Sequence, residues 1–495
     1  MPDSYEFDLL ILGGTVIDGT KIPRYDADVG ILGDTIAVIG DLSKARAPKV
    51  IDARGKIVAP GFIDAHTHDD QAILVEPQMT AKVSQGVTTV VTGNCGVSAA
   101  PLPLGAPLPM PLSLLDRDEL RFAAFGAFLD SIRRSPPAVN VVPLVGHSSL
   151  RACTMTDMNR PATETEIDDM RSLLSDALDA GAFGLSTGLF YPTAKRALTS
   201  EVIEVGRALS SRNALYVTHM RDESDDVMTS LAETFQIGRE LDVKVIISHH
   251  KVGNRRNHGR SAQTLAFIQK TMKQQAVCLD CYPYDAGSTM ISTDPNLLDG
   301  RVLVVASDPH PECAGRDLGD IALEWGVSKE EAAQRLQPGS AIYFLLSETD
   351  VQRILEFPPT MIGSDGLPGT SKPHPRLWGT FPRVLGRYCR ELGLFPLETA
   401  IWKMTGLTAR NFGIENRGTI SVGMAADLVV FDAGQVIDRA DYDHPTRTAV
   451  GIEYVVANGQ LTWKHGVHTE ICPGRLLHPI RQDCAIGSGQ RPSMT

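Results

Sequence analysis

The sequence predicts an α/β protein with a central (β/α)8 (TIM) barrel and a small β-sandwich domain built from both chain ends. Eight short apolar runs recur, with helix-like segments between them, over about 350 residues, enough for the roughly 250 residues of a bare barrel plus insertions. Glycine-separated β-rich runs occupy both ends of the chain. A length of 495 residues exceeds one compact core, so more than one domain is expected.

The two chain ends have the same sequence pattern, short β-rich runs bounded by turn residues. The N-terminal runs are Phe7–Leu12, Val29–Leu32, Thr35–Ile39 and Lys49–Asp52. The C-terminal runs are Asp427–Phe431, Val450–Ala457 and Gln460–Trp463. Asn458-Gly459 between the last two is a strong hairpin signal. Each piece is small for a core, so we expect residues 1–57 and 415–480 to form one β-domain, followed by a flexible tail over 481–495.

Residues 58–414 are expected to form the barrel. The strands are predicted at the eight apolar runs Ile57–Asp64, Thr88–Gly93, Val139–Gly146, Ala182–Thr187, Leu215–His219, Val243–His249, Ala276–Tyr282 and Thr360–Asp365. Barrel helices with a 3.6-residue apolar period are predicted at Glu164–Ala180, Glu201–Arg212, Asp226–Glu240 and Ser261–Met272. A doubly wound open sheet is disfavoured, because no G-x-G-x-x-G follows the first strand.

An insertion of about residues 286–346 separates the seventh and eighth strands. It contains a charged segment, predicted as one helix over Arg316–Leu336, and the apolar run Ala341–Leu346. A connection this long inside a compact domain is typically a lid or a binding element.

Composition excludes several classes of function. Forty-seven basic and 59 acidic residues give a formal charge of −12, so a broad cationic face for nucleic acid or anionic membranes is not expected. No apolar run reaches the length of a membrane span, and the N-terminus lacks the pattern of a secretory signal. The eight cysteines have no framework spacing, which favours reduced thiols in a cytoplasm. We therefore expect a small-molecule substrate and neither nucleic acid nor membrane as partner.

The sharpest chemical signal is His66-Thr67-His68, at the end of the first barrel strand. Alternate residues of a strand face the same side, so both imidazoles can reach one cation. Two polar loop histidines without a metal are the alternative. The position favours a metal, because barrel active sites are built at the C-terminal strand ends.

Four other strand ends carry matching chemistry, from Cys95, His219, His249 and Asp365. Thiolate, imidazole and carboxylate are the ligands that zinc prefers, and a catalytic zinc keeps three protein ligands and one open position. We expect a tight Zn²⁺ site made by Cys95, His219 and His249. A second, weaker position would be bordered by His66, His68 and Asp365.

Two neighbouring patterns are not expected to supply metal ligands. Adjacent strand residues face opposite sides, so His249 and not His250 is expected to point into the barrel mouth. Cys278 and Cys281 resemble a C-x-x-C motif, but three residues apart on a strand they face opposite sides and are assigned to packing.

Five motifs at these strand ends carry a family resemblance: Gly61-Phe62-Ile63-Asp64-Ala65-His66-Thr67-His68, Gly93-Asn94-Cys95-Gly96, Thr218-His219-Met220-Arg221-Asp222-Glu223, Ser248-His249-His250-Lys251 and Gly363-Ser364-Asp365-Gly366. Together they resemble the N-acyl-D-amino-acid deacylases (D-aminoacylases) of the amidohydrolase superfamily, closest to the N-acyl-D-glutamate and N-acyl-D-aspartate deacylase branch. The resemblance implies zinc-dependent hydrolysis of the amide bond of N-acyl-D-amino acids. It also implies that Cys95 bridges two metals where most amidohydrolases use a carbamylated lysine. Asp365 would take a proton from the attacking water and return it to the leaving amine.

The resemblance further implies that Lys251, Tyr282 and Arg376 hold the α-carboxylate of the substrate. Their positions, two residues past His249, at the end of the seventh strand and just beyond the eighth, agree with this role, because guanidinium, ammonium and phenol groups all bind carboxylates.

The stretches 257–261, 307–313 and 373–379 most closely resemble deacylases of acidic substrates, and Ser288 in the insertion is a further substrate-binding candidate. The glutamate-specific branch has an arginine soon after the Ser-Thr pair, whereas here the first arginine is Arg301. A second substrate carboxylate needs a cation. We expect an acidic D-amino acid with Arg301 as that cation, and deacylation of neutral N-acyl-D-amino acids as the alternative.

Three rival functions differ in the residues they need. A cyclic-amide hydrolase of the hydantoinase or dihydroorotase type would bridge its metals with a lysine at the fourth strand end, where Thr187-Gly188 stands. A serine hydrolase is suggested by Gly184-Leu185-Ser186-Thr187-Gly188, but no helix is predicted directly after this G-x-S-x-G. A non-enzymatic binding protein that descends from a barrel enzyme should have lost some of the metal-ligating residues. All six candidate metal ligands are present here.

Overall fold

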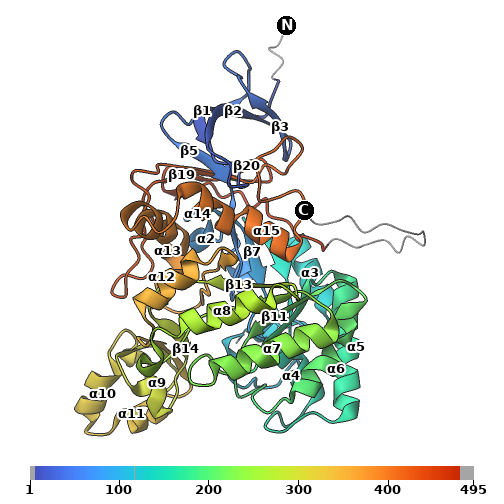
Figure 1. The fold of residues 1–495 in the computed structure, drawn as a ribbon, viewed down its shortest axis with the longest axis vertical. Coiled ribbons are helices and arrows are strands. Elements are labelled where there is room, and N and C mark those ends of the chain that lie inside the picture. Colours follow the sequence, from blue (N-terminus) through green and yellow to red (C-terminus); the bar gives the residue numbers. More distant parts are fainter. Residues whose placement is uncertain (1–5, 116, 480–495) are drawn as a thin grey trace.

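The computed structural model describes residues 6–115 and 117–479, so the tail predicted over 481–495 lies outside the described residues. A β-rich part forms one end of the elongated molecule, where the first and last strands of the chain meet, and the insertion lies at the opposite end (Figure 1). The barrel lies between them. Among the described helices, none combines the length and apolar character needed to cross a membrane.

One nine-stranded sheet unites the two chain ends. The antiparallel pairing of β5 (Ile57–Pro60) with β18 (Leu428–Phe431) joins them. The order is β21-β20-β19-β18-β5-β1-β2-β3, and β4 pairs with β1. The other strands are β1 (Leu9–Val16), β2 (Tyr25–Leu32), β3 (Thr35–Gly40), β4 (Lys49–Asp52), β19 (Ile452–Ala457), β20 (Gln460–Lys464) and β21 (Val467–His468). The sheet curls around its own apolar core, so the predicted sandwich core is enclosed by one continuous sheet (Figure 1).

The hairpin predicted at Asn458-Gly459 connects β19 and β20. Both residues have positive φ, 47° and 74°, as a two-residue type I′ turn requires. A Cβ on Gly459 would lie 1.9 Å from the carbonyl oxygen of Gly33, so a side chain does not fit at this position.

A barrel strand forms at each of the eight predicted runs, and the strands pair in chain order, as β6-β7-β8 and β9-β10-β11-β12-β13-β17. The predicted third strand is interrupted at Leu144 and forms β8 and β9. The ring closes between β6 and β17, where the backbone N of Ala65 donates to the carbonyl of Ile362 over 3.2 Å. The bounds are β6 (Phe62–Asp64), β7 (Val87–Thr92), β8 (Asn140–Pro143), β9 (Val145–Gly146), β10 (Gly184–Gly188), β11 (Leu215–His219), β12 (Val245–Ile247), β13 (Val277–Cys281) and β17 (Thr360–Ile362).

The prediction of a single strand over 57–64 is wrong. The chain divides at Gly61 into β5 of the terminal sheet and β6 of the barrel. A Cβ at Gly61 would lie 2.2 Å from Oγ1 of Thr88, so the chain passes close to the neighbouring strand here. His66 therefore lies two residues beyond the end of β6, at the barrel rim.

Helices cover the outside of the barrel. The predicted helix over 164–180 is α5, whose first turn is fixed by a reciprocal capping box between Thr163 and Glu166. The other three predicted helices are α6, α7 and α8, with ends within two residues of prediction. The bounds are α1 (Ala72–Val75), α2 (Thr80–Val83), α3 (Phe125–Arg134), α4 (His147–Thr154), α5 (Glu164–Ala180), α6 (Thr199–Ser210), α7 (Val227–Leu241), α8 (Ser261–Thr271), α12 (Glu348–Glu356), α13 (Arg376–Arg383), α14 (Leu397–Met404) and α15 (Gly406–Phe412).

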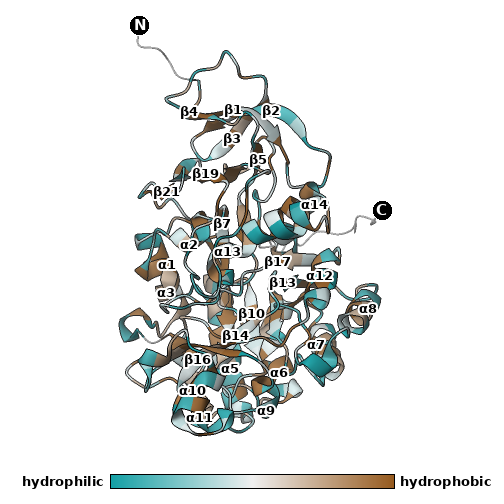
Figure 2. Cartoon of the chain, turned by 90° about the vertical axis from the view of Figure 1, so that its left-hand side faces the viewer, coloured by the Kyte–Doolittle hydropathy of each residue, from teal (hydrophilic) through white to brown (hydrophobic). Residues whose placement is uncertain are grey.

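Apolar side chains fill the inside of the barrel, and Figure 2 shows brown, apolar segments among its central strands. The strands and their immediate flanks contribute Ile63, Val91, Val142, Phe183, Val217, Ile246, Cys278 and Met361 to one buried cluster. Cys281 belongs instead to the cluster between the barrel and its helices, which confirms that the two cysteines of the C-x-x-C face opposite sides. Because the interior is packed, functional groups lie at the rim.

The insertion is a small unit with its own core. Its three strands form an antiparallel sheet in the order β14-β16-β15. The single helix predicted over 316–336 is wrong: Gly326, with φ 66°, ends α10, and Ser328 caps the start of α11. The bounds are β14 (Gly287–Met290), α9 (Pro295–Leu298), β15 (Val302–Ser307), α10 (Leu318–Trp325), α11 (Lys329–Arg335) and β16 (Gly339–Tyr343).

Candidate functional site

The six predicted metal ligands converge at the C-terminal rim of the barrel. They form two groups that share Cys95, and within each group the ligand atoms lie within 4.8 Å of one another. The first group is Cys95, His219 and His249, and the second is His66, His68, Cys95 and Asp365.

Cys95 lies at the centre of both groups. Its Sγ is 3.2 Å from Nε2 of His249, 3.6 Å from Nδ1 of His219 and 3.3 Å from Nε2 of His66. A tetrahedral zinc, at about 2.3 Å from sulfur and about 2.0 Å from nitrogen, would hold the two ligand atoms roughly 3.5 Å apart. The thiol and imidazoles therefore already have the spacing that a shared zinc requires.

The loop that carries Cys95 is held from three sides. Gly93 has φ 78°, and a Cβ there would lie 2.1 Å from the carbonyl oxygen of Leu144. The amide Nδ2 of Asn94 donates to the carbonyl of Thr67 over 3.2 Å, which ties this loop to the His66–His68 segment. Ser186 donates its hydroxyl to the Gly93 carbonyl and accepts the backbone N–H of Gly96 over 3.0 Å.

The role of Ser186 rules out the serine-hydrolase interpretation. Its side chain is fully buried inside β10, and both of its hydrogen bonds support the Cys95 loop. No described helix begins directly after β10; the next one, α6, starts at Thr199. A nucleophilic serine needs an exposed hydroxyl on a strand-to-helix turn.

Three of the six ligands adopt backbone conformations that residues with a Cβ rarely adopt. The φ angles are 54° at Cys95, 35° at His249 and 49° at Asp365. Such conformations cost free energy and concentrate at functional sites, where the surrounding structure holds them.

Glu223 orients both imidazoles of the first group. Its two carboxylate oxygens lie 3.3 Å from Nε2 of His219 and 3.2 Å from Nδ1 of His249, the nitrogens that face away from Cys95. Lys251 Nζ lies 2.7 Å from the same carboxylate. A carboxylate behind a metal-binding histidine fixes its tautomer and ring orientation.

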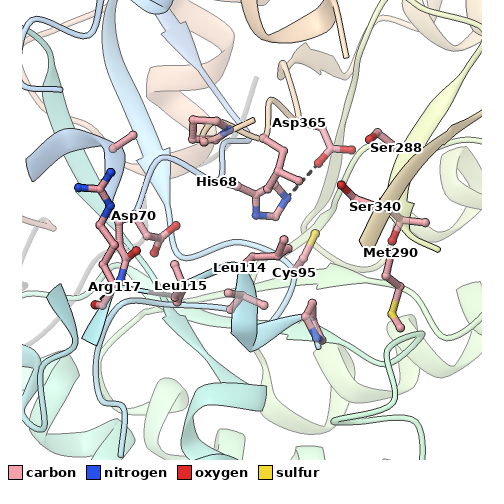
Figure 3. A pocket seen from close by; sticks show the side chains of 18 of the residues that line it. His68, Asp70, Cys95, Leu114, Leu115, Arg117, Ser288, Met290, Ser340 and Asp365 are labelled. Carbon is pink, nitrogen blue, oxygen red and sulfur yellow. Dashed lines mark hydrogen bonds and ion pairs between the residues drawn. The ribbon is translucent and has the colours of Figure 1, made fainter. Parts of the chain in front are cut away.

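The second group centres on Asp365. Its Oδ1 lies 3.1 Å from Nε2 of His68 and 3.6 Å from Nε2 of His66, as Figure 3 shows for His68. Its Oδ2 forms an ion pair of 2.9 Å with Arg376. Behind His66, the buried carboxylate of Asp280 lies 3.6 Å from Nδ1.

Charge compensation shifts the pKa values of this cluster. Burial favours the neutral Cys95 thiol, but His66 and His249 outweigh it and hold the pKa of Cys95 well below its ordinary value. Burial likewise opposes ionisation of Asp365, yet Arg376 and the histidines hold its pKa well below the usual range. Burial lowers the pKa of His68, but the interactions with Asp365 and Cys95 together outweigh it and raise this pKa to about 9. Thiolate and carboxylate are the forms that bind metal.

The three predicted carboxylate-binding residues meet on the other side of Asp365. The Arg376 guanidinium and the Lys251 ammonium lie 4.6 and 5.8 Å from the centroid of the Tyr282 ring. Within the described chain, Oη of Tyr282 and Nε of Arg376 are buried without a hydrogen-bond partner. Ser288 accepts a bond from Arg376 through its backbone carbonyl over 3.3 Å. Unpaired buried donors beside two cations suit a carboxylate.

Arg301 does not join this set. Its half-exposed guanidinium lies 3.6 Å from the carboxylate of Asp317 and packs over the Phe344 ring. It does not line either cavity at the mouth. His250 points away as predicted, with Nε2 2.8 Å from Oγ1 of Thr264 in α8.

Two cavities meet over the metal ligands. Both are lined by Tyr191, Ser288, Thr289, Asp365 and Arg376. With the open solvent at their mouths included, the clamp lobe measures about 710 Å³ and the outer lobe about 1040 Å³. The clamp lobe is also lined by Lys251, Tyr282 and His219, and the outer lobe by His68 and Cys95 (Figure 3). A linear molecule can therefore extend in both directions from Asp365.

Sequence reasoning missed three residues of the site. Glu223 lies four positions after His219 and could have been found as a partner of that histidine. Asp280 is a charged residue inside an otherwise apolar strand, and this unusual position could have indicated a functional role. Tyr191, whose ring lies 4.9 Å from that of His219, follows a strand end without any local motif.

Comparison with known proteins gives a consistent family. The model of the amidohydrolase family matches residues 49–276 and 320–463. The D-aminoacylase of Alcaligenes xylosoxydans xylosoxydans is 56% identical over 476 residues, which cover 96% of this chain and 98% of that protein. The N-acyl-D-aspartate deacylase of the same organism is 48% identical over 474 residues, covering 95% of each.

Solved structures agree. A D-aminoacylase structure, described with a binuclear metal centre that one metal activates and a second attenuates, superposes with a TM-score of 0.94 at 56% identity, covering 95% of this chain and 100% of that one. The N-acyl-D-glutamate deacylase of Bordetella bronchiseptica, in complex with zinc and a phosphonate mimic of the tetrahedral intermediate, has a TM-score of 0.93 at 44% identity, covering 95% and 99%.

Proposed function

This chain belongs to the amidohydrolase family, and we propose that it removes the acyl group from N-acyl-D-amino acids whose side chains are apolar. It is a metal-dependent hydrolase of a linear amide, which yields a carboxylate and a free D-amino acid. The observation that supports this best is the placement of two ligand groups, joined through Cys95, directly beside the unpaired donors of Tyr282 and Arg376.

The cofactor is Zn²⁺. The donor set of thiol, imidazoles and carboxylate fits zinc, and the separations around Cys95 match its bond lengths. Cys95, His219 and His249 would hold the tight ion, and His66, His68 and Asp365 would border a weaker second position. When bound, zinc supplies a Lewis acid that polarises the acyl carbonyl and lowers the pKa of water.

Asp365 is positioned to move protons. Its carboxylate faces the ligand cluster through Oδ1 and Arg376 through Oδ2, at the junction of the two lobes. Held ionised by Arg376, it can accept a proton from the attacking water and return it to the amine nitrogen that leaves.

Lys251, Tyr282 and Arg376 would bind the α-carboxylate. With this group fixed on one side of Asp365 and the acyl carbonyl at the ligand cluster, two of the four substituents of the α-carbon are set. The side chain of one enantiomer then enters the clamp lobe, while that of the other meets its wall. The named relatives act on D-amino acids, which supports the D enantiomer here.

The clamp lobe favours an apolar side chain. Its wall includes Phe190, Leu297, Tyr343, Leu345 and Leu346. Among the described lining residues, the only cations are Lys251 and Arg376, which are assigned to the α-carboxylate. An acidic substrate needs a further cation, and the candidate for it, Arg301, lies elsewhere, so a second substrate carboxylate would be buried without a partner.

A reducing cytoplasm is the compartment we propose, because all seven cysteines among the described residues are free thiols.

Hydrolysis of N-acetyl-D-leucine, N-acetyl-D-glutamate, N-acetyl-D-aspartate and N-acetyl-L-leucine by the zinc-loaded enzyme tests the proposal. We expect kcat/KM for N-acetyl-D-leucine to exceed that for either acidic substrate at least tenfold, roughly the cost of one buried unpaired charge. We expect negligible turnover of the L-compound. Faster hydrolysis of an acidic substrate would contradict the apolar assignment, and equal rates on both enantiomers would contradict the stereochemical one.

A charge placed in the clamp lobe tests the side-chain assignment separately. Leu297→Arg should raise the ratio of kcat/KM for N-acetyl-D-glutamate over N-acetyl-D-leucine, because it supplies the missing cation. Leu198→Arg is the matched control: this leucine is 55% exposed and lines neither cavity. An unchanged ratio in the Leu297 variant would show that the substrate side chain lies elsewhere.

A further inference from the structure

In the proposed function the amino-acid half of the substrate occupies the clamp lobe, which leaves the outer lobe without an assigned ligand. The outer lobe begins at the ligand cluster, with His68, Cys95 and Asp365, and extends away from Lys251 and Tyr282, which line only the clamp lobe. Its free space, about 1040 Å³ when the open solvent at its mouth is included, exceeds that of the clamp lobe, about 710 Å³ counted in the same way.

The wall of the outer lobe is mainly apolar. Side chains from five separate segments contribute: Val75, Val97, Leu114, Leu115, Met290 and Leu367. Figure 3 shows Leu114 and Leu115 near Cys95, with Met290 on the opposite side. Val97 and Leu115 are anchored in a buried apolar cluster of their own, so this wall has fixed support.

Leu114 distinguishes this wall from ordinary packing. It is 38% exposed although it lies beside a cavity lined by other apolar groups. An apolar side chain left facing a concave apolar surface next to a reactive centre favours binding of an apolar ligand.

The direction of the substrate follows from the shared residues of the two lobes. The scissile amide must lie at their junction, beside Asp365. If the carboxylate and side chain of the D-amino acid occupy the clamp lobe, the acyl group has to leave the ligand cluster through the outer lobe.

We infer that the outer lobe binds an alkyl chain, so that the enzyme acts on N-acyl-D-amino acids whose acyl groups are longer than acetyl. The inference rests on the proposed function and adds the acyl half of the substrate. Water attacks the acyl carbonyl, the C–N bond breaks, and a fatty carboxylate and a D-amino acid leave, with no further reactant required.

A chain-length series tests the inference on the zinc-loaded full-length enzyme. We would measure kcat/KM for N-acetyl-, N-butanoyl-, N-hexanoyl- and N-octanoyl-D-leucine below their critical micelle concentrations. We expect kcat/KM to rise with length, by up to about fourfold for each methylene that is fully buried. Octanoate should also inhibit competitively at lower concentration than acetate.

A variant pair locates the chain in the lobe. Leu114→Asp should lower the ratio of kcat/KM for N-octanoyl- over N-acetyl-D-leucine about tenfold or more, because it places a charge beside the alkyl chain. Leu104→Asp is the matched control, a leucine of the same segment that is 60% exposed and lines neither cavity, and it should leave the ratio unchanged.

The possible outcomes distinguish failure of this inference from failure of the proposed function. A fall in kcat/KM from the acetyl to the hexanoyl substrate, with N-acetyl-D-leucine still hydrolysed, would overturn this inference and leave the proposed function intact. It is also possible that kcat/KM rises with acyl length but that Leu114→Asp and Leu104→Asp lower the octanoyl-to-acetyl ratio equally. That result would place the alkyl chain outside the outer lobe and would overturn this inference. If no N-acyl-D-amino acid of any length were hydrolysed, the proposed function would fail, and this inference with it.

Discussion

The two ligand groups share Cys95 but are supported in different ways. In the first group, one carboxylate, Glu223, faces the rear nitrogens of both His219 and His249. In the second group, the ligand carboxylate of Asp365 is already engaged by Arg376 and His68. In the proposed function, the first group would therefore hold an ion in fixed geometry. The carboxylate of the second group would be shared between an ion and Arg376, which suits weaker binding and proton transfer.

Loss of the shared ligand should have the largest effect. Cys95→Ala removes the thiolate from both groups, so we expect loss of bound zinc and a fall in kcat/KM of about a thousandfold or more, since a Lewis acid contributes several kcal/mol. Metal analysis and kinetics on the same sample measure both. Cys153→Ala, a half-buried thiol outside the clusters, is the control. Full zinc content in the Cys95 variant would refute the ligand assignment.

Asp365→Asn should separate the two groups. It leaves Cys95, His219 and His249 intact, so we expect one zinc per chain to remain while kcat falls by about 10²–10⁴-fold, the usual contribution of a general acid–base group. Asp308→Asn, an exposed carboxyl of the insertion, should change neither quantity. If the Asp365 variant lost its zinc, the assignment of Asp365 to the weaker group would be wrong.

Glu223→Gln should have a smaller effect, restricted to the first group. The amide keeps the shape but not the charge behind the imidazoles, so zinc affinity should fall about 10–100-fold, as measured by competition with a chelator. The nearby Asp225, which pairs with Arg256 at the surface, supplies the control Asp225→Asn. Equal affinities in the two variants would mean that Glu223 does not support the metal.

Much of the fold could be predicted because its signals are local. Most barrel strands coincide with one short apolar run, and Asn458-Gly459 has the residue types that its turn requires. Where prediction failed, a local break overrode the pattern. Gly61 separates two strands that read as one apolar run, and Gly326 with Ser328 divides a helix that read as continuous.

The sequence by itself determined which residue types stand at the strand ends, and hence the chemistry of Cys95, the histidines and Asp365. Only the tertiary structure decided which nitrogen of each imidazole faces Cys95, that Glu223 and Asp280 lie behind them, and that Arg301 lies apart. Which residues near a strand end face the same side follows from the alternation of side chains along a few residues. Distances between side chains more than a hundred residues apart follow from closure of the barrel and the paths of its loops, which no local pattern encodes.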